Sequence, residues 1–152
     1  MSPRNDDSGY RRPESVLVVV FTTAGDVLLL RRREPADWWQ SVTGSLRWGE
    51  TPLHAALREL REETGLHGDA DLEDCARINE YPIIEPWKSH FAPGVTVNRE
   101  HVFRLRLPER QTVELAPDEH IEYVWLPRAE AAARATSPTD REAILEFVPA
   151  PV

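Results

Sequence analysis

Short apolar stretches separated by turn-forming residues recur along this chain, and they predict a β-sheet. The run Val16–Phe21 is β-branched and apolar, and turn-forming residues separate it from Val27–Leu30, so the two are expected to form a hairpin. Four further strands are predicted at Val42–Thr43, Leu72–Ile84 (bent by Pro82), Val95–Leu107 and Ile121–Leu126.

Three segments carry helical patterns instead. The first, Leu53–Glu63, follows Thr51 as N-cap and Pro52 at the first helical position, and Gly65 is placed to end it. Two more helices are expected at Pro127–Ala135 and Thr139–Phe147, the last with Ile144, Leu145 and Phe147 facing inward. Because helices and strand groups alternate, the fold class predicted is α/β, a mixed sheet with helices on its faces.

The first helix combines an apolar stripe with a group of carboxylates. At about 100° per residue, one side gathers Leu53, Ala56, Leu57, Leu60 and Thr64. Glu59 and Glu63 border this stripe, with Glu62 further round. Like charges at this spacing repel, and carboxylate oxygens suit a hard cation such as Mg²⁺. An equal alternative from the helix alone is a solvated face with an Arg58–Glu62 ion pair.

Composition narrows the possible classes of protein. The chain has 152 residues, 41% of them hydrophobic and 29% charged, which suits one domain with one core over residues 10–152. Residues 1–9 are polar and predict a short disordered leader rather than a secretory signal. The single Cys75 excludes an intrachain disulfide and fits a cytoplasmic location. No apolar run is long enough to span a bilayer.

The net charge of −8 argues against general binding to nucleic acid or to an anionic membrane. A small phosphorylated ligand needs only a local cationic pocket, and Arg31–Arg33 is the densest positive charge in the chain. Of the adjacent Trp38 and Trp39, at most one is required in the core and the other is free to line a pocket. The long segment 85–94 is expected to be a binding loop or lid, a dimer contact, or both. His90 within it is favoured as an ordinary surface histidine.

Gly44, Glu50 and the run from Arg58 to Leu66 have a diagnostic spacing. They match the signature G-x5-E-x7-R-E-U-x-E-E-x-G-U, in which U is apolar, at every defined position. This stretch resembles the Nudix hydrolases. The resemblance implies an α/β/α sandwich and hydrolysis of a nucleoside-diphosphate-linked compound with Mg²⁺ or Mn²⁺ as cofactor.

The resemblance extends beyond the signature, through Tyr10–Pro13, Trp39–Ser45, Phe91–Thr96, Glu119–His120 and Trp125–Leu126. Together these segments are similar to the bacterial dihydroneopterin triphosphate pyrophosphohydrolases of folate synthesis. That resemblance implies cleavage between the α- and β-phosphates, releasing pyrophosphate and the pterin monophosphate. The alternatives are a Nudix hydrolase acting on dATP, another nucleoside triphosphate, ADP-ribose or a dinucleoside polyphosphate, and a non-catalytic nucleotide-binding module. All signature carboxylates are present, which disfavours the last.

The family pattern also implies roles for individual residues. Metal ligands are expected at Glu59 and Glu63, with Glu62 and Glu119 as further candidates, and Glu119 or Glu62 would be the general base. Arg58 would orient the carboxylates, and Gly44, Glu50 and Gly65 would be structural. The pterin enzymes imply substrate contacts from Arg11, Arg32, Thr43, Tyr81, Pro82, Ile83, Ile84 and Ser137. Arg12, Arg31 and Arg33 could replace the two arginines, and Ser137 could instead be an N-cap; the oligomeric state, monomer or homodimer, stays open.

Overall fold

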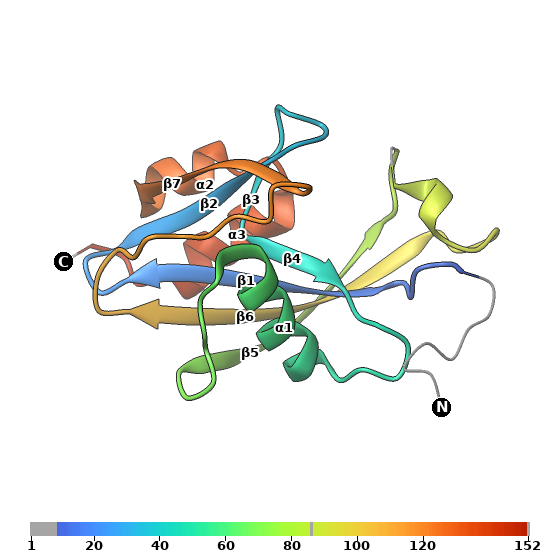
Figure 1. Cartoon of the computed structure of the whole chain (residues 1–152), viewed down its shortest axis with the longest axis horizontal. Coiled ribbons are helices and arrows are strands. Elements are labelled where there is room, and N and C mark those ends of the chain that lie inside the picture. The colour runs from blue at the N-terminus through green and yellow to red at the C-terminus, as the bar shows by residue number, and fades with distance from the viewer. Residues whose placement is uncertain (1–8, 86, 152) are drawn as a thin grey trace.

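The computed structural model describes residues 9–85 and 87–151 as one mixed sheet between helices (Figure 1). The strands are β1 Glu14–Thr22, β2 Asp26–Arg32, β3 Trp39–Gln40, β4 Val42–Ser45, β5 Leu72–Pro82, β6 Val97–Leu107 and β7 His120–Pro127. The helices are α1 Pro52–Thr64, α2 Arg128–Arg134 and α3 Pro138–Phe147, with a short 3₁₀ turn η1 at Lys88–His90. The predicted leader 1–9 falls outside the described residues except for Gly9.

Strand β1 lies at the centre of the sheet. It pairs in parallel with β6 along its whole length and antiparallel with β4 and β2, while β7 and β3 pair with β2 and β5 pairs with β6. This arrangement brings β4, which precedes α1 in the chain, beside the first half of β1.

Alternation along β1 divides the core into two layers. Val16, Val18 and Val20 join the cluster that contains Ala56 and Leu60 of α1. The intervening residues, from Leu17 to Phe21, join the cluster built with α2 and α3 on the opposite face. A strand buried on both sides reads as one continuous apolar run, which explains Val16–Phe21.

Three details of the sequence prediction were wrong. Leu53 is 51% exposed, because the core contacts of α1 begin only at Ala55. Leu145 is 44% exposed, because α3 buries a strip at helical spacing that passes through Ala143 and Ile144 and leaves Leu145 outside. Pro82 ends β5 rather than bending it.

The irregularity in β5 lies much nearer its start than Pro82. The register with β6 shifts between Asp74 and Arg77, where Ala76 has a positive φ of 55°. Residues inserted on one strand of an antiparallel pair bend that strand and strengthen its twist.

Candidate active site

Both ends of helix α1 are fixed by local backbone chemistry. The Oγ1 of Thr51 accepts a hydrogen bond from His54 N at 3.2 Å, Pro52 opens the helix, and Gly65 ends it with φ 76°. Thr51, Pro52 and Gly65 thus act as the sequence predicted. Glu59 and Glu63 are consequently held one turn apart on the side that packs against β4.

Gly44 in β4 makes room for one of these carboxylates. A Cβ placed at residue 44 would lie 1.5 Å from Oε2 of Glu59, so no other amino acid fits there without moving that side chain. The neighbouring Thr43 donates its backbone N–H to Glu63. Strand β4 therefore positions both carboxylates through its backbone.

Burial makes this pair of carboxylates electrostatically costly. Glu63 is 2% exposed, and burial followed by the charges of Glu59 and Glu119 raises its pKa well above the usual range. Burial also raises the pKa of Glu59 to about 7, with Glu62 and Glu119 adding to the effect against the opposing charge of Arg58. A cation bound between these carboxylates would lower both pKa values and stabilise the charged forms.

The donor set fits a divalent cation. Oε1 of Glu63 is buried and finds no hydrogen-bond partner among the described residues, although buried polar atoms are normally paired. In the part of the chain that is described, no group of three or more acidic, His or Cys side chains is arranged to hold a metal by itself. Mg²⁺ does not require such a cage, since it typically uses one or two carboxylates together with waters and substrate phosphates.

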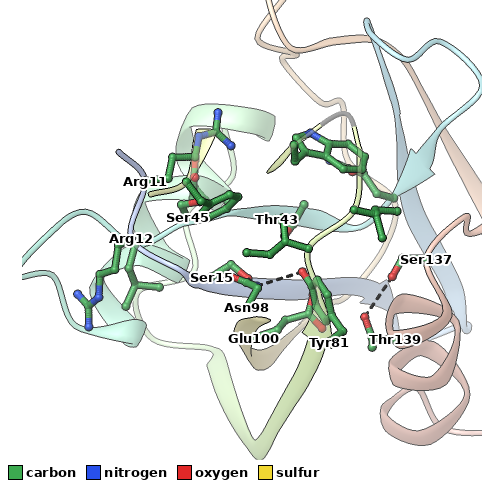
Figure 2. A pocket seen from close by; sticks show the side chains of 18 of the residues that line it. Arg11, Arg12, Ser15, Thr43, Ser45, Tyr81, Asn98, Glu100, Ser137 and Thr139 are labelled. Carbon is green, nitrogen blue, oxygen red and sulfur yellow. Dashed lines mark hydrogen bonds between the residues drawn. The ribbon is translucent and has the colours of Figure 1, made fainter. Parts of the chain in front are cut away.

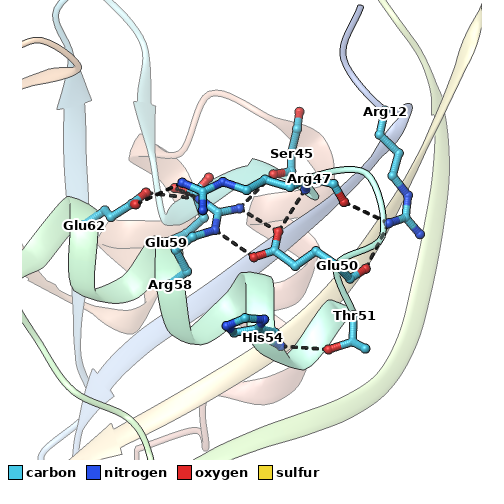
Figure 3. A network of polar contacts seen from close by, with 9 residues as sticks. All are labelled: Arg12, Ser45, Arg47, Glu50, Thr51, His54, Arg58, Glu59 and Glu62. Atoms are coloured by element: carbon cyan, nitrogen blue, oxygen red, sulfur yellow. Dashed lines mark hydrogen bonds and ion pairs between the residues drawn. The ribbon is translucent and has the colours of Figure 1, made fainter. Parts of the chain in front are cut away.

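Arg58 connects α1 to the loop after β4 (Figure 3). Its Nε and Nη2 both donate to the carboxylate of Glu50 at 2.8 Å, and Nη2 also reaches the carbonyl of Ser45 at 3.2 Å. Nη1 lies 3.4 Å from Oε1 of Glu59. A two-pronged guanidinium–carboxylate pair fixes geometry as well as charge, and the Glu50 contact raises the pKa of Arg58.

Glu62 differs from the other two acids of the helix. Its side chain is 46% exposed and forms ion pairs with Arg58 at 3.1 Å and with Arg47 at 3.6 Å. It does not line the cavity described next, whereas Glu59 and Glu63 do. The i,i+4 pair considered from the sequence therefore exists, beside the acidic pair rather than instead of it.

A cavity of about 950 Å³ is lined by Glu59 and Glu63. Figure 2 shows other residues of its wall, among them Thr43, Tyr81 and Ser137. The cavity is lined by thirteen of the sixteen residues to which the family pattern assigns roles: Arg11, Arg32, Thr43, Gly44, Arg58, Glu59, Glu63, Tyr81, Pro82, Ile83, Ile84, Glu119 and Ser137. Glu62, Glu50 and Gly65 lie outside it. Volume and lining suit a small organic ligand with charged groups.

The three consecutive arginines have separate contacts. Arg31 pairs with Glu122 at 3.1 Å, and Arg33 donates to the carbonyl of Pro117 at 3.2 Å. Only Arg32 of the three lines the cavity, where it stacks over Trp87 with its Cζ 5.4 Å from the ring centre. The register of β2 with β7 shifts between Arg31 and Arg32, and Arg33 lies beyond the end of the strand, so the three side chains do not share one direction.

The arginines near the N-terminus both line the cavity, but with different freedom. Arg12 is held by the carboxylate of Glu14 at 2.7 Å and by the carbonyl of Glu50 at 2.9 Å. Arg11 is exposed and its backbone N–H donates to the carbonyl of His90, so its side chain remains the better placed of the two to meet a ligand.

The adjacent tryptophans divide as expected. Trp39 packs against the α2–α3 core cluster, with the guanidinium of Arg134 over its ring. Trp38 lines the cavity and meets Trp87 edge to face, with the two ring centres 4.9 Å apart. Trp87 comes from the 85–94 segment, which adds Phe91 to the cavity wall. His90 is exposed and lies outside this cavity.

Sequence reasoning missed several buried polar residues at the site. His120 is 2% exposed with Nε2 at 3.1 Å from Gln40 Nε2, and burial lowers its pKa to about 4, so the ring is neutral. Asn98 and Glu100 are buried on β6 and line the cavity. For Asn98 and Glu100 a signal was available in the sequence: they precede the buried Val102 at a spacing of two, so they lie on the same face of β6.

Comparison with known proteins agrees with this geometry. Residues 11–147 match the NUDIX domain. The chain belongs to the Nudix family. It is 42% identical over 93% of its length to dihydroneopterin triphosphate diphosphatase of Escherichia coli K12, and it covers 96% of that protein. The Haemophilus influenzae protein of the same name is 34% identical, with 91% of this chain and 89% of the relative covered.

Solved structures of Nudix proteins show the same fold. The structure of the E. coli dihydroneopterin triphosphate pyrophosphohydrolase superimposes with a TM-score of 0.86 at 43% identity, covering 91% of this chain and 97% of that one. These findings confirm the predicted family, the α/β/α fold and the assignment as a Nudix hydrolase. Nudix hydrolases use a divalent metal and a small phosphorylated substrate, in keeping with the site.

Other predictions were less fully tested. No helix in the described ranges is long and apolar enough to cross a membrane. The cytoplasmic location, the lack of nucleic-acid binding and the single domain over residues 10–152 stay predictions. The roles of the individual site residues likewise stay predictions.

Proposed function

We propose that this Nudix hydrolase cleaves dihydroneopterin triphosphate between its α- and β-phosphates, releasing pyrophosphate and dihydroneopterin monophosphate. The observation that carries the proposal is one cavity that joins the acidic pair and Arg32 to a wall with the aromatic rings of Trp38, Tyr81 and Trp87. Phosphates and a flat ring have suitable partners in the same space. The relatives that are 42% and 34% identical carry the name of this activity.

The acidic pair would hold the metal, Mg²⁺ by preference and Mn²⁺ as the alternative. Glu59 and Glu63 are the proposed ligands, and Glu119, which lines the same cavity and affects the pKa of both, is the proposed third. When bound, the ion supplies neutralisation of phosphate charge and a lowered pKa for the attacking water.

The protein's own groups would perform the remaining tasks. Arg32 and Arg11 bind the outer phosphates, and Arg58 keeps Glu59 in place while itself held by Glu50. Glu119 takes the proton from the water that attacks in line with the departing pyrophosphate. Glu62, the other candidate base, is engaged by two arginines and lies outside the cavity.

The remaining predicted substrate contacts also belong to the cavity wall. Thr43, Tyr81 and Ser137 line the cavity, as does the apolar edge formed by Pro82, Ile83 and Ile84. Ser137 also stands at the N-cap position of α3, but its hydroxyl makes no capping hydrogen bond and lies 3.1 Å from Oγ1 of Thr139. Its side chain is therefore available to a ligand.

A substrate panel tests the proposal. With Mg²⁺ present, dihydroneopterin triphosphate should show the highest kcat/KM among itself, dATP, ADP-ribose and a dinucleoside polyphosphate, with pyrophosphate as the released product. Glu63→Gln, assayed in parallel, controls for contaminating phosphatases. A higher kcat/KM for another member of the panel would overturn the substrate assignment, and release of single phosphates would overturn the bond assignment.

A further inference from the structure

The cavity has a second buried carboxylate, far along the chain from the acidic helix. Glu100 of β6 is 4% exposed and yet lines the cavity. It lies beside Ser15 in the register of the parallel β1–β6 pair and beside Asn79 in the antiparallel β5–β6 pair. Glu100 is thus set in the middle of three strands, where backbone movement is restricted.

The contacts of Glu100 come from neutral groups. Asn79 Nδ2 donates to its Oε1 at 3.2 Å, and the hydroxyls of Thr139 and Tyr81 also bond to the carboxyl. Within residues 9–85 and 87–151, no ion pair joins Glu100 to a basic side chain. Burial accordingly raises its pKa. A buried carboxyl without a cation is costly, which raises the question of what else meets it.

Around Glu100 the cavity wall is polar and ordered. Asn98 Nδ2 donates to Ser15 Oγ at 2.8 Å and to the Tyr81 hydroxyl at 3.1 Å. Figure 2 shows Tyr81, Asn98 and Glu100 grouped on one side of Thr43, with Arg11 and Ser45 on the other. Glu59 and Glu63, the proposed metal ligands, come from α1 on one face of the sheet. Thr139 comes from α3 on the opposite face. A ligand with its phosphates at the acidic helix has this polar group within the same cavity for its other end.

We propose that Glu100 is a specificity-determining residue that binds the ring of the substrate at an edge carrying two adjacent N–H donors. Such an edge occurs in a 2-aminopyrimidin-4-one ring, where the exocyclic amine stands next to a ring N–H. The inference rests on the proposed function, because the pterin ring contains this edge. Glu100 takes no part in the bond cleavage.

Donor and acceptor patterns explain why this ring class is preferred. The two oxygens of an ionised carboxylate are acceptors only, and they match two parallel N–H donors. Adenine offers an amine beside a ring nitrogen that carries a lone pair, so one oxygen of the carboxylate would face a second acceptor. A site built to accept hydrogen bonds discriminates strongly against a ligand that leaves them unmade.

The simpler explanation is structural. Glu100 could serve only to connect β5, β6 and α3 through Asn79, Tyr81 and Thr139. The two explanations differ in what Glu100→Gln should do. Glutamine keeps the size and one acceptor for Asn79, but replaces the second acceptor by an amide donor, a pattern that suits adenine better than a 2-aminopyrimidinone.

The decisive measurement is the ratio of kcat/KM for dihydroneopterin triphosphate to kcat/KM for dATP, in wild type and Glu100→Gln. We expect the ratio to fall roughly 10- to 100-fold in the variant, the range for a lost ring hydrogen bond to a buried charge. The loss should fall mainly on the pterin substrate and be seen in KM. Glu80→Gln is the matched control on neighbouring β5, since Glu80 is exposed and outside the cavity; its ratio should equal that of the wild type.

An unchanged ratio, whether both kcat/KM values stay the same or fall equally, would overturn the role of Glu100 and leave the proposed function intact. A wild-type protein inactive on dihydroneopterin triphosphate would overturn the proposed function itself. If Glu100→Gln does not fold, competition in the wild type replaces it. Phosphate-free dihydroneopterin should then inhibit more strongly than adenosine, and equal inhibition would overturn the inference.

Discussion

Oε2 of Glu59 occupies the space into which a side chain at Gly44 would project. A Cβ built at residue 44 would come within 1.5 Å of that oxygen. The two residues are separated by the loop that leads from β4 into α1, so the close approach depends on how helix and sheet pack. Gly44 is therefore required because it has no side chain: the space left beside β4 is occupied by the carboxylate of Glu59 from α1.

Gly44→Ala should abolish most of the activity while the protein remains folded. The added methyl group must displace the side chain of Glu59. A displacement of about 1 Å at a catalytic site can lower the rate about a hundredfold. Steady-state kinetics with Mg²⁺ check the rate, and circular dichroism checks the fold. Gly25→Ala, in the turn between β1 and β2 and outside the cavity, provides a contrast: its added Cβ meets no atom, and its cost is backbone strain at φ 92°, which should lower stability rather than activity. Activity within a few-fold of wild type in Gly44→Ala would contradict the geometry.

Glu63→Gln and Glu62→Gln should separate the acids of α1. Glu63 is buried with an unpaired oxygen, so its loss should remove nearly all Mg²⁺-dependent activity and the rise in melting temperature caused by Mg²⁺. Glu62 is exposed and paired with arginines, so the same change there should cost about tenfold or less. Kinetics and thermal shift with and without Mg²⁺ measure both effects. Equal losses in the two variants would contradict the distinction.

Arg58→Lys should lower the free energy of unfolding by about 2 kcal/mol. Lysine keeps the charge but cannot make the paired 2.8 Å contacts to Glu50 while also reaching Glu59, and a buried partner left unsatisfied costs about 1–3 kcal/mol. Urea denaturation gives the value. Arg61→Lys, an exposed position on the same helix, should change stability by less than about 0.5 kcal/mol. A matching small change at Arg58 would refute the structural role of the pair.

Asp140 should make stability depend on pH. It is 1% exposed, and its two oxygens accept hydrogen bonds from Ser41 N at 2.6 Å and Ser41 Oγ at 2.7 Å. Burial raises its pKa from 3.8 to about 6, so between these pH values the folded protein binds more protons than the unfolded chain. The free energy of unfolding therefore falls as pH rises from about 4 to about 6, by up to about 3 kcal/mol from this group.

Asp140→Asn cannot titrate at this position and supplies the control. The stability of wild type relative to Asp140→Asn should decrease across that pH range and then level off. Urea denaturation at several pH values from 4 to 7 measures the difference, in which the shared titration of the other acids cancels. Parallel curves for the two proteins would show that burial of Asp140 carries no pH-dependent cost.

The local pattern of the chain predicted most of its elements because that information is carried by neighbouring residues. Thr51, Pro52 and Gly65 define α1 by backbone chemistry that needs no distant partner. The same holds for the continuous apolar run of β1, which is buried on both faces. Where burial depends on what lies opposite, pattern alone was insufficient, and Leu53 and Leu145 were placed inside although they are 51% and 44% exposed.

The sequence by itself determined the family and the acidic helix, because the spacing from Gly44 to Leu66 is contained in one continuous stretch. Only the tertiary structure decided that Glu63 is buried while Glu62 is solvated, and that Arg32 rather than its neighbours lines the cavity. It also brought Glu100 of β6 to that cavity, and it placed Glu119, from the turn before β7, there as the family pattern had implied. These relationships arise from packing between β4, β6, β7 and the helices, which no local pattern encodes, since depth of burial and direction of a side chain depend on residues remote in sequence.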